Sequence, residues 1–236
     1  MHSSMNRRIM KNNDPFEEQW LNKLEAGLTK IGKARLYKEI KKTLLSENKI
    51  EWSQLLMEFL SDHLNDSEIR EVMCSCACLK PKDDLQYIKN EYDKTKDVAY
   101  VHNLLQQYFE KFIRAYKNLN EDQMEFLRKN GWGLAGKLEG DVIYSTKIPK
   151  DFHNYFIEDD PLKKRFLYCH CPRIRESILE DKPIDDKYCY CGAGFYKDIW
   201  EYILQKEVKV QIIKSIMKGD DVCQIAIYHD VIDKSS

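Results

Sequence analysis

Two pairs of alternating cysteines are the residues whose types and spacing most clearly suggest chemistry. Cys169 and Cys171 lie in the motif CHC, and Cys189 and Cys191 lie in the motif CYC. A structural zinc site uses four such thiolates, with Zn–S distances of about 2.3 Å. The four cysteines are therefore predicted to bind zinc, provided that the chain folds the two motifs against each other.

The spacing within each pair sets a condition on this prediction. Cysteines two positions apart in a flat strand are separated by about 6.6 Å along the chain, so they chelate one ion only where the backbone bends. Pro172 and Gly192, directly after the two pairs, are where bends are expected. His170 points to the opposite face of a regular strand and is a poorer ligand than its two neighbours.

Cys191 is also a candidate catalytic nucleophile. It precedes GAGFYKDIWEYIL, a predicted helix whose first N–H groups could stabilise a thiolate and lower the pKa of the thiol. Acyl transfer also needs a base. The sequence does not say which of the histidines, His102, His153, His170 or His229, would supply it.

The remaining cysteines have a structural interpretation as well. Unpaired cysteine often packs as a small apolar side chain, and this role is favoured for Cys223 in DVCQIAIYH. Cys74, Cys76 and Cys78 in CSCAC either line a helix end or a turn, or complete a larger thiolate site with the later pairs.

Composition excludes several classes of protein. The 236 residues include 38 Lys and Arg against 39 Asp and Glu, without a basic stripe, so nucleic acid is not expected as a partner. Apolar runs are far shorter than the roughly 18–20 residues that span a membrane, and the first residues lack the apolar segment of a secretory signal. A cytoplasmic protein is expected, with its 8 cysteines as reduced thiols.

The first half of the chain predicts successive helices. Asp14 can cap and Pro15 suits the first turn of a helix with apolar residues at helical spacing up to Ile31. Further helices are expected over residues 33–45, 51–64 and 97–116. The last has one continuous apolar face and is predicted to be the central core helix.

The second half predicts a sheet. Strands are expected over residues 133–138, 142–148 and 165–171, then a helix over 194–204 and a terminal hairpin that turns through Gly219. The predicted fold class is α+β, with a helical N-terminal half packed on a C-terminal antiparallel sheet with a late helix and a terminal hairpin. Residues 1–14 are expected to be a disordered tail, and 15–236 a single domain with a helical part (15–119) and a cysteine-rich sheet part (120–236).

Two arginines in CPRIRE are candidate ligand contacts. Alternation places Arg173 and Arg175 on one side of an extended segment, where they could bind a carboxylate in bidentate fashion. Exposure of the two arginines to solvent at the edge of a sheet would explain them equally well. The 14 Tyr, 9 Phe and 4 Trp suit an apolar cavity or an ordinary core.

Residues 169–229 carry a resemblance to a known superfamily. A small-residue turn is followed by a helix with Glu201, a strand, a turn at Gly219 and Asp220, and Cys223 at the start of the last strand. This order resembles the 4-vinyl reductase type of small-molecule-binding domain and the related aminothiazoline-carboxylate hydrolase-like proteins. The resemblance implies helices on a twisted antiparallel sheet around an apolar pocket, cysteines that contact ligand or metal, and a ligand role for Glu201.

The leading hypothesis is a cytoplasmic, sensor-like domain that binds a small apolar or amphipathic molecule. The late helix and the hairpin would line its pocket, and the cysteines would lie at the rim. Zinc is the candidate cofactor. One alternative is a cysteine-dependent hydrolase of amide or thiazoline substrates, in which Cys191 or Cys189 attacks; the chain shows no complete hydrolase signature. The other is a protein-interaction module with an acyl-type pocket and a homodimer surface.

Overall fold

The computed structural model describes residues 14–79 and 81–230. The predicted N-terminal tail therefore lies outside the described residues except for Asp14. The side chain of Asp14 accepts a hydrogen bond from the backbone N–H of Phe16 and caps the first helix, as predicted.

Seven helices fill the described part of the first half. They are α1 (Pro15–Lys30), α2 (Ala34–Thr43), α3 (Lys49–His63), α4 (Asp66–Ser75), α5 (Gln86–Thr95), α6 (Val98–Lys117) and α7 (Glu121–Asn130). A short 3-10 turn, η1 (Asp83–Leu85), leads into α5. Asn side chains cap α3, α4 and α7, as expected from their ability to accept from the first free N–H groups. The predicted helical half is confirmed.

The second half contains the four-stranded antiparallel sheet. Its strands are β1 (Lys137–Glu139), β2 (Val142–Thr146), β3 (Lys209–Lys214) and β4 (Gln224–Tyr228), in the order β1-β2-β4-β3. The helical elements are α8 (Phe152–Ile157), α9 (Pro161–Tyr168), α10 (Glu176–Leu179) and α11 (Tyr190–Leu204), with 3-10 turns η2 (Asp186–Cys189) and η3 (Ile216–Lys218). The α+β class and the terminal hairpin are confirmed.

The predicted strand over residues 165–171 is wrong. Asp160 caps a helix there by accepting from the N–H groups of Leu162 and Lys163, and Pro161 occupies its first turn. Helix α9 then ends at Tyr168, so the CHC motif lies in the irregular segment after a helix. The cysteines of that motif are therefore free of the flat-strand geometry that would hold them apart.

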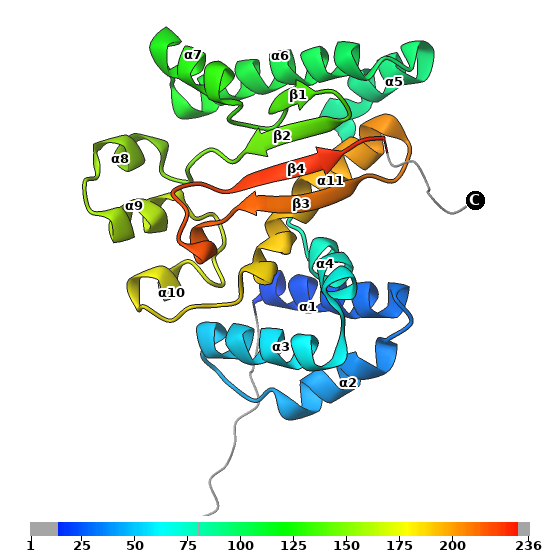
Figure 1. The fold of residues 1–236 in the computed structure, drawn as a ribbon, viewed down its shortest axis with the longest axis vertical. Coiled ribbons are helices and arrows are strands. Elements are labelled where there is room, and N and C mark those ends of the chain that lie inside the picture. Colours follow the sequence, from blue (N-terminus) through cyan, green and yellow to red (C-terminus); the bar gives the residue numbers. More distant parts are fainter. Residues whose placement is uncertain (1–13, 80, 231–236) are drawn as a thin grey trace, which may run out of the picture.

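The central helix is α11, whereas α6 was the predicted one. Helix α6 buries a single face and lies at one end of the molecule, above the sheet (Figure 1). Helix α11 crosses behind the sheet and contacts α4, α5 and β3. Its approach to α4 is so close that a Cβ on Gly194 would lie 2.1 Å from the backbone oxygen of Cys74. This contact fixes where α11 begins, and with it the position of the CYC motif.

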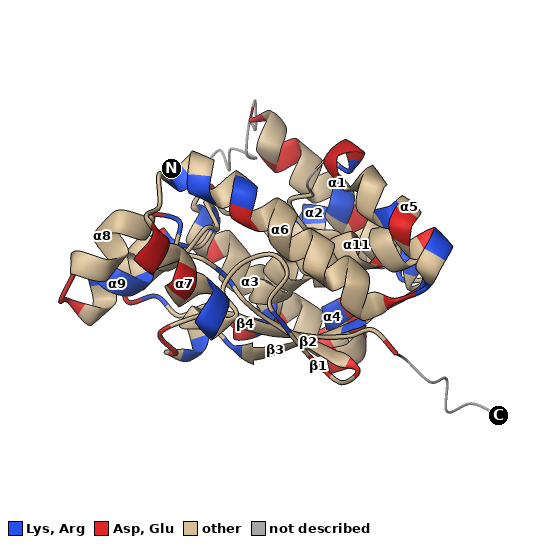
Figure 2. Ribbon diagram, turned by 90° about the horizontal axis from the view of Figure 1, so that it is seen from above, with Lys and Arg blue, Asp and Glu red and all other residues tan. Residues whose placement is uncertain are grey.

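Both halves of the chain contribute to one hydrophobic core. Leu24 of α1, Leu105 of α6, Trp200 of α11 and Ile227 of β4 are all fully buried members of it. Charged residues lie on the outer faces of the helices, with both signs interspersed (Figure 2).

Candidate thiol–lysine site

Cysteines from three segments lie near the start of α11. Cys189 ends η2, Cys169 and Cys171 follow α9, and Cys223 precedes β4. After burial, Cys223, Cys169 and Cys171 contribute to raising the pKa of Cys189, and Cys191 contributes to raising that of Cys171. The hydrogen bond from Arg173 Nε to the Tyr188 hydroxyl, at 2.8 Å, joins the segments that carry the CHC and CYC motifs, as the zinc prediction requires.

Lys147 provides a positive charge among these sulfur atoms. It follows β2, and its backbone N–H donates to the backbone oxygen of Cys223 at 2.9 Å. Its Nζ lies 3.2 Å from the position that a Cβ on Gly192 would occupy. Burial alone would lower the pKa of Lys147, but Cys223, Tyr196 and Cys169 raise it above the ordinary value, so the ammonium keeps its charge at neutral pH.

We call Lys147, Cys169, Cys171, Cys189 and Cys223 the thiol–lysine cluster. All five side chains are half-buried. Within the described ranges Lys147 forms no ion pair with a carboxylate, so its nearest ionisable neighbours are thiols and a tyrosine. An ammonium in such surroundings stabilises negative charge on sulfur.

Polar groups near the cluster partly offset the effect of burial on its thiols. Burial raises the pKa of Cys223 and of Cys189, while the backbone N–H of Ile216 and the side chain of Ser215, respectively, act to lower it. Backbone N–H groups act in the same direction on Cys169 and Cys171. Such groups favour the thiolate form that binds a metal.

Cys191 differs from the cluster in its burial and in its hydrogen bond. Its side chain is buried, and its Sγ donates to the backbone oxygen of Cys76 at 3.1 Å. Cys76 donates in turn to the oxygen of Val72 at the end of α4. Cys74 and Cys76 thus line a helix end, one of the two predicted roles for CSCAC, and exposed Cys78 interacts with Cys191.

The thiols lack the properties of a hydrolase nucleophile. Burial raises the pKa of Cys191 to about 11 and that of Cys171 to about 12. His170 Nε2 donates to the backbone oxygen of Ile148 at 2.7 Å, and burial with the charge of Lys147 lowers the pKa of His170 to about 4. Across residues 14–79 and 81–230, no cysteine shares a hydrogen bond with a histidine. The hydrolase alternative therefore gains no support from the geometry.

Alkylation tests this electrostatic description. At pH 7 and after metal removal, we expect iodoacetamide to modify exposed Cys78 first and the thiols of the cluster slowly, because neutral thiols are poor nucleophiles. Peptide mapping by mass spectrometry gives the rate at each cysteine, and Cys78→Ser serves as the control. Rapid modification of Cys191 well below pH 8 would instead identify it as an activated nucleophile.

Arg173 binds a carboxylate of the protein itself. The guanidinium is 2% exposed and forms an ion pair with Glu17, while its Nε donates to the hydroxyl of Tyr188 at 2.8 Å. It also lies 4.2 Å from the ring centroid of Trp20. No exposed surface of this side chain remains for a ligand, so the predicted ligand role is replaced by a structural one.

Arg175 and Glu201 also have partners inside the protein. Residues 172–175 form a turn, so Arg175 points away from Arg173 and stacks on Phe166 at 3.8 Å. Glu201 Oε1 accepts from Lys197 at 2.5 Å and from the N–H of Val208 at 3.2 Å. Glu201 therefore fixes the connection between α11 and β3.

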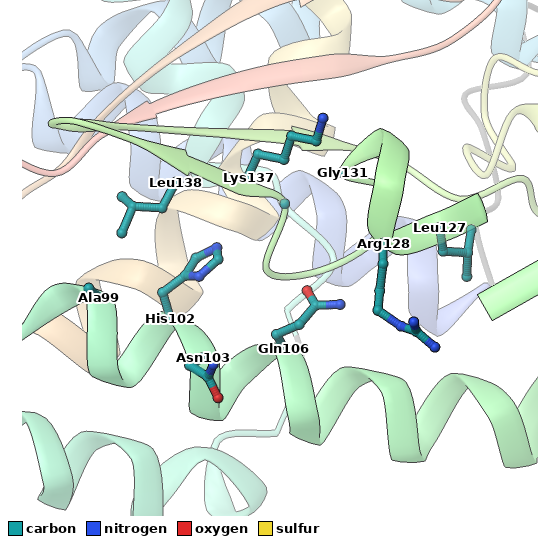
Figure 3. Close-up of a pocket in the computed structure, with 10 residues that line it drawn as sticks. Ala99, His102, Asn103, Gln106, Leu127, Arg128, Gly131, Lys137 and Leu138 are labelled. Carbon is teal, nitrogen blue, oxygen red and sulfur yellow. The ribbon is translucent and has the colours of Figure 1, made fainter. Parts of the chain in front are cut away.

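Two open depressions lie on the surface of the described residues, and no cysteine lines either of them. One, of about 390 Å³, lies between α6, α7 and β1 and is lined by polar side chains such as His102 and Gln106 together with apolar ones such as Leu138 (Figure 3). The other, of about 550 Å³, lies beside α3 and residues 183–185. The predicted apolar pocket with a cysteine rim coincides with neither.

The predicted zinc site is not assembled in this structure. In the part of the chain that the structure describes, no three His, Cys, Asp or Glu side chains are placed to hold one metal ion. Nor is any helix in that part long and apolar enough to cross a membrane.

Two members of the cluster were not among the predicted site residues. Cys223 was interpreted as core, and it is a half-buried side chain packed against the hydrophobic core, with Lys147 bonded to its backbone oxygen. Lys147 belongs to no recognisable sequence motif. Only the pairing of β2 with β4 brings it to the end of the hairpin formed by β3 and β4. Its position near the end of the strand predicted over residues 142–148 was the signal available from the sequence.

Comparison with known proteins gives one match. No curated protein and no solved structure matches the chain. The resemblance to the 4-vinyl reductase type remains an expectation. Residues 144–232, which contain the entire thiol–lysine cluster, match a family of unknown function, DUF6144.

Proposed function

We propose that this chain binds a thiophilic metal ion through the thiol–lysine cluster. The observation that carries the proposal is the ammonium of Lys147, which lies among Cys169, Cys189 and Cys223 and has no carboxylate partner within the described ranges. A partly buried charge is costly unless it is compensated. Thiolates formed on metal binding would supply that compensation.

The chemistry of the surrounding groups supports a metal rather than a covalent substrate. Burial keeps the thiols protonated in the free protein, and a metal ion replaces those protons when it binds. Thiolates prefer soft ions such as Cu⁺ and Zn²⁺. The N–H and O–H donors on the sulfur atoms would orient the ligands and stabilise their charge.

Binding requires some movement of the ligands, since they do not converge in the structure. Cys169 and Cys171 follow the end of α9, and Cys223 lies just before β4. Rotation of cysteine side chains about χ1 between staggered positions displaces sulfur without unfolding these segments. The ion itself would complete the site.

Metal titration tests the proposal. Metal-free protein is expected to bind one equivalent of Zn²⁺ or Cu⁺ in competition with a chelator. The double variant Cys189→Ser, Cys223→Ser is expected to lose affinity by about 100-fold or more, because removing two ligands costs more than removing a group that only orients a ligand.

The matched control is Cys74→Ser, because Cys74 is a buried cysteine of α4 outside the cluster. This variant should bind the metal ion with the affinity of the unmodified protein. Substoichiometric binding of both ions by the unmodified protein would refute the proposal. Equal affinity in the double variant and the control would refute the assignment to this cluster.

A further inference from the structure

We infer that the depression between α6, α7 and β1 binds a small organic anion, a carboxylate or a phosphate ester with an apolar body. This site is separate from the proposed metal site, because none of its lining residues belongs to the thiol–lysine cluster. Its volume of about 390 Å³ lies within the range of small-molecule sites, roughly 300–1,000 Å³. Three features carry the inference: a rigid wall, the charge of the lining residues, and a buried polar atom without a partner.

The loop that forms one wall of the depression is held in a single position. Its residues Gly133 and Gly136 have φ angles of +116° and +68°, which favour glycine. A Cβ on Gly133 would lie 2.1 Å from the ring of Phe109 in α6. One on Gly136 would lie 2.4 Å from the backbone oxygen of Tyr144 in β2. The loop thus packs against both α6 and the sheet, so this wall is formed before a ligand binds, which lowers the cost of binding.

The charges that line the depression are positive. Arg128 and Lys137 line it, and among the described residues no Asp or Glu does so. Arg128 forms ion pairs with three carboxylates outside the lining, whereas Lys137 is exposed and forms none within the described chain. The side-chain amides of Asn103 and Gln106 on α6 add hydrogen-bond donors. The ammonium of Lys137 is therefore the charge available to an anion.

His102 gives the depression a polar group that lacks a partner. Its ring points from α6 toward β1 (Figure 3). Its Nε2 is buried without a hydrogen-bond partner in the described part of the chain, and the same holds for Nε1 of Trp200. The rings of His102 and Trp200 stack with centroids 6.2 Å apart. Because an unpaired buried polar atom is costly, an anionic oxygen that accepts a hydrogen bond from His102 would bind favourably here.

Apolar side chains complete the lining. Ala99, Leu127 and Leu138 come from α6, α7 and β1, respectively. They would contact the apolar body of a ligand, while Lys137 and His102 bind its anionic end. The lining is therefore matched to a small amphipathic anion, for which benzoate and phenyl phosphate are suitable probes.

NMR titration of the metal-free full chain tests the inference. Benzoate and phenyl phosphate should shift the amide signals of Gly131, Gly136 and Lys137, with a Kd on the order of 1 mM for probes of about ten non-hydrogen atoms. Benzamide and benzylammonium, of similar size, should bind about 10-fold more weakly. The ratio between the two anions identifies the preferred head group. Equal binding of the neutral or cationic probe would overturn the charge assignment, and an absence of shifts with both anions well above that Kd would refute the site.

Two pairs of variants locate the bound anion. Asn103→Trp fills the depression from an exposed position of α6 and should abolish benzoate binding, whereas Gln107→Trp, also exposed but outside the lining, should not. Lys137→Gln should weaken benzoate binding by about 3-fold to 5-fold, and Lys129→Gln, at an exposed lysine of α7, should leave it unchanged. The unshifted signals of the remaining residues show that each variant is folded. Benzoate binding that survives Asn103→Trp would place the anion elsewhere and overturn the inference.

Discussion

Replacing Glu17 by glutamine is expected to lower the free energy of unfolding by about 3–5 kcal/mol, because it leaves the guanidinium of Arg173 charged and unpaired in the core. The two side chains are 1% and 2% exposed, so water cannot compensate for the lost carboxylate. Urea unfolding followed by circular dichroism measures the change. Glu18→Gln, at the exposed next position of α1, is the matched control and should have little effect. A loss below about 1 kcal/mol, the range of exposed ion pairs, would show that Arg173 is compensated in another way.

This ion pair also lies next to the cysteines of the proposed metal site. Arg173 lies two residues after Cys171, and its partner Tyr188 directly precedes Cys189. The ring of Tyr188 stacks on Trp20 of α1 with centroids 5.9 Å apart. Glu17, Arg173 and Tyr188 therefore connect the CHC and CYC motifs to each other and to α1. Glu17→Gln is expected to weaken metal binding as well as stability.

The substitution Gly194→Ala is expected to cost about 3 kcal/mol of stability, at the upper end of what overpacking usually costs. The added methyl group would lie 2.1 Å from the backbone oxygen of Cys74, and a backbone atom inside a helix cannot move aside cheaply. The midpoint of thermal or urea unfolding reports the loss.

Gly192→Ala provides the comparison from the same turn of α11. Its methyl group would meet Lys147 Nζ at 3.2 Å, which is the mobile end of a long side chain. We expect a small change in stability but a weaker metal affinity, since the ammonium is displaced. Equal destabilisation by the two substitutions would contradict the close packing of α11 on α4.

Patterns along the chain were sufficient to predict most of the fold. Periodic apolar residues with Asp or Asn caps identified the early helices, and β-branched runs around Gly219 identified the terminal hairpin. Residues 165–168 end a helix in place of the predicted strand, because Asp160 caps this helix and Pro161 occupies its first turn. A capping side chain with proline in the first turn was the stronger local signal.

The site was predictable only in part, because tertiary contacts decide which residues belong to it. Spacing identified the CHC and CYC motifs, which the fold brings together through the bond between Arg173 and Tyr188. No local pattern could show that the carboxylate bound by Arg173 belongs to Glu17 in the first helix. Lys147 joins the cluster through the pairing of strands distant in sequence.

X-ray absorption at the metal edge of protein loaded with one equivalent of Cu⁺ tests the central claim most directly. The account predicts a first coordination shell of sulfur alone, which is lost in the Cys189→Ser, Cys223→Ser double variant and kept in Cys74→Ser. A shell dominated by nitrogen or oxygen, or a sulfur shell that survives in the double variant, would contradict it.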